Sequence, residues 1–220
     1  MSVEKTLSDR VSTRAFKDTA VPEALLSKIF SKAQLSPSNC NVQPWQTYVV
    51  SGDKKAFLQK ALLKEIFRKE GPNPDFGWSV EYSGKHRERQ FGSANALYSA
   101  MDISRENKKA RTGAMLKNWE FFGAPHAAFF TMDKYLDIMG AVDLGIYAQS
   151  LALLLQEKGI SSCFQGALAQ YPKPARELFG LSEDQGILFG MSFGYAYEEA
   201  EVNQARTVRE AIEDSVCFIT

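Results

Sequence analysis

One long apolar segment constrains the fold of this chain more than any other feature of its sequence. Residues 142–158 are nearly all apolar, and Gly159 follows them as a helix stop. This length and composition predict a central helix that is buried by the rest of the protein. The most apolar part, residues 144–155, contains Gln149 and is too short to span a bilayer, so we expect no membrane segment.

Shorter regular segments alternate around this predicted helix, without repeats or low-complexity linkers. A loop at 71–78 breaks every periodicity, and we expect it to be a lid or a variable insertion. The elements predict one α+β domain over residues 1–220, whose tail at 198–220 ends in apolar residues that need a surface to lie against. Helices are predicted at 22–35, 53–69, 89–101, 108–118 and 173–179, buried strands at 47–50, 127–131 and 187–194, and a strand or turn at 161–164.

The composition excludes several classes of protein. Lys and Arg together number 26, as do Asp and Glu, so the formal net charge is zero, and 45% of the residues are hydrophobic. Disordered chains and proteins that bind nucleic acid through a basic field differ from this pattern. Three cysteines without CxxC spacing and two histidines predict neither a disulfide framework nor a metal site. Together with the lack of a targeting segment, they favour a reducing, cytoplasmic setting.

Arg10, Ser12 and Arg14 form the first segment that could carry chemistry. They occupy alternate positions, so in an extended segment they would project from one face. Arginine donates bidentate, charge-assisted hydrogen bonds to phosphate, and serine adds a further donor. The alternative is a solvated basic edge near the N-terminus, and the spacing alone leaves both interpretations open.

Three later segments are rich in small or polar residues. Residues 36–45 could present donors and acceptors to a planar polar ligand, or could form an ordinary loop between a helix and a strand. In residues 159–166, Gly166 permits close approach of the backbone to a ligand, and Gln165 offers a donor and an acceptor. In residues 203–209, Arg206 and Arg209 either complete a phosphate site or are solvated.

Other conspicuous residues favour structural roles. No activating motif surrounds Cys163, which is interpreted as a buried thiol. His126 precedes a predicted core strand and is interpreted as a structural histidine, and Trp45 as a core residue. The sequence contains no GxGxxG, Walker A, GxSxG or HExxH motif, so a tightly held dinucleotide is not indicated.

Taken together, these segments resemble the nitroreductase family of flavin-dependent oxidoreductases. The similarity runs from about residue 7 to 218 and is loosest at 70–115, the region that shapes the substrate pocket in this family. The matching motifs are Arg-x-Ser-x-Arg-x-Phe at 10–16, Ser-Pro-Ser-x-x-Asn-x-Gln-Pro-Trp at 36–45, Phe-Phe-Gly-Ala-Pro-His at 121–126, Asp-x-Gly-x-x-x-Gln at 143–149, Gly-Ile-x-Ser-Cys-x-Gln-Gly at 159–166 and Asn-x-x-Arg-x-x-Arg at 203–209.

The resemblance implies an intertwined homodimer with FMN at the subunit interface. Its fold is an α+β sandwich whose mainly antiparallel sheet is flanked by helices, with exchange of the C-terminal arms. Arg10 and Arg209 would hold the FMN phosphate with Ser12 beside them and Arg206 as a helper, and Arg14 would lie near the flavin N1–O2 edge. The implied cofactor-binding set is Arg10, Val11, Ser12, Arg14, Pro37, Ser38, Asn39, Asn41, Gln165, Gly166, Arg206 and Arg209, with residues 37–41 supplied by the other subunit.

The implied activity is the reduction of nitroaromatic compounds by NADH or NADPH, in two-electron steps of a ping-pong mechanism. The hydride chemistry belongs to FMN, so no catalytic side chain is expected, although Gln165 would lie near flavin N5. Phe76, Trp78, Tyr82 and Phe122 are the candidate substrate-pocket residues. The alternatives are reduction or dehydrogenation of quinones, enones or halogenated phenols on the same scaffold, or flavin binding without catalysis.

Overall fold

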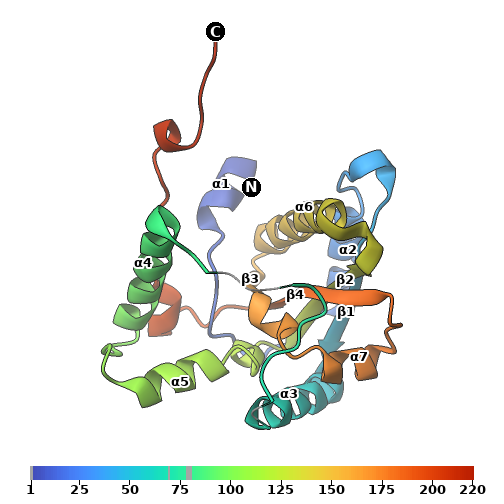
Figure 1. Cartoon of the computed structure of the whole chain (residues 1–220), viewed down its shortest axis with the longest axis horizontal. Coiled ribbons are helices and arrows are strands. Elements are labelled where there is room, and N and C mark those ends of the chain that lie inside the picture. The colour runs from blue at the N-terminus through green and yellow to red at the C-terminus, as the bar shows by residue number, and fades with distance from the viewer. Residues whose placement is uncertain (1, 69, 78–80) are drawn as a thin grey trace.

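The chain folds around one four-stranded antiparallel sheet with the order β1-β2-β4-β3, which confirms the α+β prediction (Figure 1). We describe it from a computed structural model that covers residues 2–68, 70–77 and 81–220. The strands are β1 (Gln46–Ser51), β2 (His126–Asp133), β3 (Ser161–Gln165) and β4 (Gln185–Gly194).

The two faces of the sheet are covered by different helices. On one face, α2 packs against α6 in a core that contains Phe130, Tyr147 and Phe193, and on the other α3 packs against α7 around Leu58 and Phe129. Helices α4 and α5 bury no residue in this chain and lie at one side of the sandwich (Figure 1). The helices are α1 (Val3–Asp9), α2 (Glu23–Ala33), α3 (Gly52–Phe67), α4 (Gly84–Ala100), α5 (Lys108–Leu116), α6 (Asp137–Glu157) and α7 (Lys173–Phe179).

Strand β1 lies at the edge of the sheet, so the prediction of a buried strand at 47–50 is correct for the strand and wrong for the burial. It pairs only with β2, and of its residues only Val50 is buried, whereas Val49 is 40% exposed. Strand β2 lies between β1 and β4, and seven of its eight residues are buried. The sequences of β1 and β2 are similarly hydrophobic, so the difference in burial comes from the place of each strand, at the edge or in the middle of the sheet.

The long apolar helix is α6, and it begins five residues before the predicted segment. Leu144, Tyr147, Leu151 and Leu155 form its buried side, as expected for a central helix. With the preceding turn the helix extends over residues 134–157, which by length and composition alone is enough to cross a membrane. The prediction that the apolar segment is too short to span a bilayer is therefore wrong. Core helices of globular proteins share this composition, and here α6 packs on the sheet and on α2.

The loop at 71–77, which the sequence predicts as a lid or a variable insertion, is held against the body of the protein. Asp75 accepts hydrogen bonds from the Arg176 guanidinium (3.0 Å) and from the backbone N–H of Ile187 (2.9 Å). Phe76 packs against the core and approaches Gly186 so closely that a Cβ atom there would meet its ring. Trp78, the last residue of the predicted loop, lies outside the described residues.

His126 is the structural histidine that the sequence predicted. Its Nε2 accepts the backbone N–H of Val21 at 2.9 Å, its Nδ1 pairs with the hydroxyl of Ser51, and its ring stacks on Phe193. Burial lowers the pKa of His126, and the charge of Lys55 lowers it further. The neutral imidazole is therefore the form that the folded protein accommodates.

This shift predicts a loss of stability in mild acid. The folded state holds the pKa below 6.5, the ordinary value, so below about pH 6.5 the unfolded chain binds a proton that the folded chain does not, and stability falls with pH. Urea unfolding at about pH 7.5 and about pH 5.5 should show a larger loss for the natural protein than for His126→Gln, which does not titrate. Equal losses in both proteins would contradict this account.

Candidate functional site

The N-terminal segment that carries Arg10, Ser12 and Arg14 extends the sheet beyond β3. Ser12 forms a parallel bridge with Ser162, and the Thr13 N–H donates to the Ser162 carbonyl at 3.1 Å. Thr13 is buried while its neighbours Ser12 and Arg14 are not, as alternation along an extended segment requires. The segment is therefore a rigid extension of the sheet edge.

The bridge between Ser12 and Ser162 brings this segment next to Cys163 on β3. Burial raises the pKa of the Cys163 thiol, against the opposing effects of Arg14, of a hydrogen bond from Ser12 and of Arg10. The thiol is thus buried and protonated, as the sequence predicted. The two guanidinium groups and the hydroxyl that the resemblance assigns to FMN therefore lie at one place on the sheet edge.

The four arginines at 10, 14, 206 and 209 have no carboxylate partner in the part of the chain that the structure describes. Among the ion pairs of residues 2–68, 70–77 and 81–220, none involves Arg10, Arg14, Arg206 or Arg209. Unpaired guanidinium groups fit an anion such as a phosphate, which takes up bidentate hydrogen bonds. The donor set at the sheet edge therefore fits FMN.

Arg206 and Arg209 lie along the C-terminal tail, in a groove of about 950 Å³ between the tail and α4. Arg206 donates to the Asn203 carbonyl at 2.8 Å, and Arg209 donates to the hydroxyl of Thr207 at 2.8 Å. An ion pair of 2.8 Å between Arg89 and Glu210 joins the tail to α4. No hydrogen bond of the described residues links either tail arginine to Arg10.

The loop at 37–41 is positioned by α6. Both carboxylate oxygens of Asp143 accept the backbone N–H of Asn39, at 3.0 and 3.2 Å, and the Ser38 hydroxyl accepts the N–H of Gln43. Cys40 and Asn41 adopt left-handed backbone conformations that keep the loop compact. Within one chain the loop lies across α6 from the N-terminal segment (Figure 1). One protomer therefore does not bring the two halves of the expected site together.

The side chain of Gln165 is committed to the protein interior. It is 2% exposed, its amide nitrogen donates to the Asn118 carbonyl at 2.8 Å, and its oxygen accepts the hydroxyl of Ser192. A ligand at this end of β3 would therefore meet the backbone of Gln165 and Gly166. The resemblance assigns the backbone N–H groups of these two residues to flavin N5 and O4, and that assignment stays a prediction.

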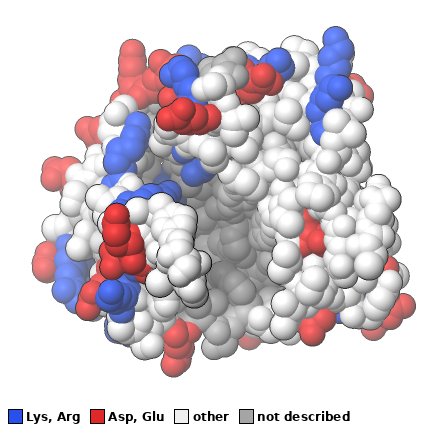
Figure 2. All heavy atoms as spheres, turned by 90° about the horizontal axis from the view of Figure 1, so that it is seen from above, with Lys and Arg blue, Asp and Glu red and all other residues white. Residues whose placement is uncertain are grey.

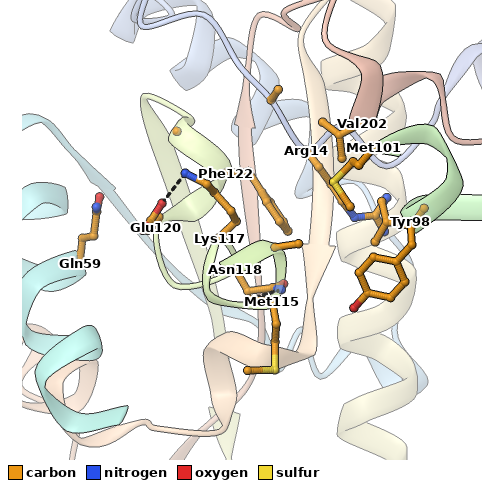
Figure 3. Close-up of a pocket in the computed structure, with 14 residues that line it drawn as sticks. Arg14, Gln59, Tyr98, Met101, Met115, Lys117, Asn118, Glu120, Phe122 and Val202 are labelled. Carbon is orange, nitrogen blue, oxygen red and sulfur yellow. Dashed lines mark hydrogen bonds and ion pairs between the residues drawn. The ribbon is translucent and has the colours of Figure 1, made fainter. Parts of the chain in front are cut away.

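A cavity of about 500 Å³ opens beside Arg14 (Figure 3). Its walls are mostly apolar, and its charged residues are Arg14 and the ion-paired Lys117 and Glu120, 2.9 Å apart. The lining residues are Arg14, Ala15, Gln59, Leu97, Tyr98, Met101, Ala114, Met115, Lys117, Asn118, Glu120, Phe122, Gly123 and Val202.

Of the four candidate pocket residues, Phe122 lines this cavity. Phe76 packs in the core and exposed Tyr82 lies outside the lining, while Trp78 falls outside the described residues. Tyr98 was not among the predicted residues, and the guanidinium of Arg111 lies over its ring, 5.0 Å from the ring centre. The only sequence signal was its place in the variable region at 70–115.

Comparison with known proteins decides the family. The sequence model of the nitroreductase family matches residues 7–195 of this chain. The chain belongs to the nitroreductase family. Nitroreductase NfnB of Mycolicibacterium smegmatis is 34% identical over 99% of this chain and 92% of its own length, and 4-nitrobenzoate reductase of Pseudomonas putida is 33% identical over 97% and 93%.

Solved structures agree with this assignment. The FMN and NADPH-dependent nitroreductase NfnB from sphigopyxis sp. strain HMH superposes with a TM-score of 0.96, at 33% identity over all of both chains. The FMN-dependent NfnB from Mycobacterium smegmatis, in complex with NADPH, has a TM-score of 0.94 at 33% identity and covers 99% of this chain and 97% of its own. The resemblance in sequence therefore extends to the whole fold.

Asp143 and Asn203 stand in the quoted motifs, but their positioning roles could not be predicted from the sequence. Asp143 holds the backbone of the loop at 37–41, and Asn203 holds the backbone of residues 14 and 15. Each of these side chains bonds to residues that are more than 100 positions away in the sequence. Among the described residues, no cluster of three or more His, Cys, Asp or Glu could hold a metal ion.

Proposed function

We propose that this protein is an FMN-dependent oxidoreductase that uses NAD(P)H to reduce nitroaromatic compounds. One observation carries the proposal: Arg14 belongs both to the unpaired basic segment at the sheet edge and to the lining of an apolar cavity. An anionic cofactor held by the basic segment would present its ring system to that cavity. The relatives named above, which include nitroreductases and a 4-nitrobenzoate reductase, support the same activity.

The chain's own residues would bind and orient FMN. Arg10, Ser12 and Arg209 would hold the phosphate, and Arg14 would stabilise negative charge at the N1–O2 edge. The backbone of Gln165 and Gly166 would face the N5 edge. When bound, FMN supplies the hydride and electron transfer, so the protein needs no nucleophile or strong base of its own.

The cavity beside Arg14 would take the substrate ring. Phe122 and Tyr98 offer aromatic surfaces, and Met101 and Met115 offer adaptable thioether contacts. A space of about 500 Å³ suits a single substituted aromatic ring. Its size also supports alternate occupation by nicotinamide and substrate, which is the physical basis of a ping-pong sequence.

A homodimer would complete the site, because the loop at 37–41 and the basic segment lie apart within one chain. Ile138, Val142 and Ile146 form an exposed apolar stripe on α6 at four-residue spacing. In Figure 2 the side over α2 and α6 carries few charged groups. The exposed C-terminal tail, which leaves the body in Figure 1, would cross to the partner. Three free cysteines support a cytoplasmic setting.

Anaerobic reduction tests the function. Purified protein should be yellow, NADH or NADPH should bleach the flavin, and a nitrobenzoate should restore the colour. A protein that cannot be reconstituted with FMN would overturn the proposal, and flavin that no nicotinamide bleaches would indicate a non-catalytic binder. Steady-state turnover with nitrobenzoates, quinones and halogenated phenols would then separate nitroreduction from the alternative substrate classes.

A further inference from the structure

The side chain of Asn203 makes four hydrogen bonds, and three of them reach residues that are far away in the sequence. It is 8% exposed and lies in a short 3-10 helix, Glu201–Gln204. Its amide oxygen accepts the backbone N–H groups of Arg14 (2.7 Å) and Ala15 (3.2 Å). Its amide nitrogen donates to the carbonyls of Ala15 (2.8 Å) and Tyr197 (2.9 Å). All four bonds have partners on the main chain.

These bonds fix the part of the chain from which the Arg14 side chain projects. The backbone around Arg14 is paired on one side through Ser12 with β3 and on the other side through Phe16 with Ala196. Asn203 bonds to the backbone of Arg14 and Ala15, which lie between these two paired residues. The main-chain carbonyl of Asn203 also accepts a hydrogen bond from Arg206 at 2.8 Å. One residue therefore contacts two of the four arginines expected around the cofactor.

The same contacts form one wall of the cavity. Arg14, Ala15 and Val202 all line it, and Asn203 holds the first two to the chain segment of the third. An amide is required here because both main-chain donors and main-chain acceptors face the side chain. A carboxylate would place an oxygen against two carbonyl oxygens, and an alanine would leave two N–H groups without an acceptor.

We propose that Asn203 is a positioning residue for the flavin site, which acts by fixing Arg14 where the reduced ring of the cofactor develops negative charge. This inference rests on the proposed function, because without bound FMN the hydrogen bonds of Asn203 would only join the N-terminal segment to the C-terminal tail. Its effect on the cofactor should therefore depend on the presence of the Arg14 guanidinium.

A double-mutant cycle tests this dependence. We expect Asn203→Ala in the full-length protein to weaken FMN binding by about tenfold and to make the reduction potential of bound FMN more negative. In an Arg14→Ala background the same change should have little further effect on either quantity, since the cation that Asn203 positions is already gone. Asn203→Asp keeps the volume of the side chain and serves the same cycle if the alanine variant does not fold.

Gln204→Ala is the matched control, because Gln204 is the exposed neighbour in the same 3-10 helix and makes one hydrogen bond, to the Glu198 carbonyl. It should leave FMN affinity and potential unchanged. Equal losses from Asn203→Ala with and without Arg14 would show a merely structural role and overturn the inference. Unchanged FMN affinity and potential in Asn203→Ala would overturn it as well. Failure of the natural protein to bind FMN would instead refute the proposed function.

Discussion

Replacing Arg10 with alanine should weaken FMN binding by roughly 1.5–3 kcal/mol, which is about 10- to 150-fold in the dissociation constant. Arg10 has no carboxylate partner among the residues of the described structure, so its removal breaks no internal ion pair. It acts electrostatically on buried Cys163, which puts it at the sheet edge beside Ser12 and Arg14. The lost affinity would therefore report a contact with the cofactor.

Flavin fluorescence on the full-length variant measures this change. Arg68→Ala is the matched control, because Arg68 pairs with Glu65 on the surface of α3, away from the basic segment, and its loss should leave FMN affinity unaltered. Arg10→Lys should give an intermediate loss, since lysine keeps the charge but cannot form a bidentate contact with phosphate. An Arg10→Ala protein with the affinity of the natural one would place the phosphate elsewhere.

The sequence predicted the elements of the fold better than their burial. Residues 173–179 form the expected helix, and the apolar segment that begins at residue 142 forms most of the central helix α6. Burial of β1 was predicted wrongly because strand order, which decides what covers a strand, depends on pairings that no local pattern contains. The contacts of the loop at 71–77 could not be predicted, because its anchor, Asp75, bonds to residues more than 100 positions away.

For the candidate site as well, features that depend on neighbouring residues could be predicted from the sequence, and features that depend on distant contacts could not. The shared face of Arg10, Ser12 and Arg14 could be predicted because these residues are neighbours in the sequence, whereas their assignment to a phosphate came from the resemblance to the family. Tyr98, Met101 and Met115 were not predicted as lining residues, because α4 and α5 bury nothing in this chain and no buried position marks the side that faces the cavity. Asn203 was visible as part of a motif, but its partners at residues 14 and 15 were not.

Val142→Asp on α6 should convert a homodimer into monomers and release FMN. Val142 is 50% exposed and stands at the middle of the apolar stripe formed with Ile138 and Ile146. In a two-fold interface each substitution appears twice, so two carboxylates would lose water. An uncompensated buried charge costs about 3–5 kcal/mol, so the dimer should weaken by more than about 100-fold.

The two losses should occur together, because the flavin site needs both chains. The loop at 37–41, held by Asp143 one residue beyond Val142, and the basic segment at 10–14 lie on opposite sides of α6 within a protomer. Light scattering and FMN content on the same preparation measure both effects. Phe57→Asp places the same charge on an exposed apolar position of α3 and should leave a yellow dimer. A Val142→Asp protein that remains dimeric and fully loaded would show that α6 does not form the interface, and a monomer that keeps FMN would show that one chain suffices.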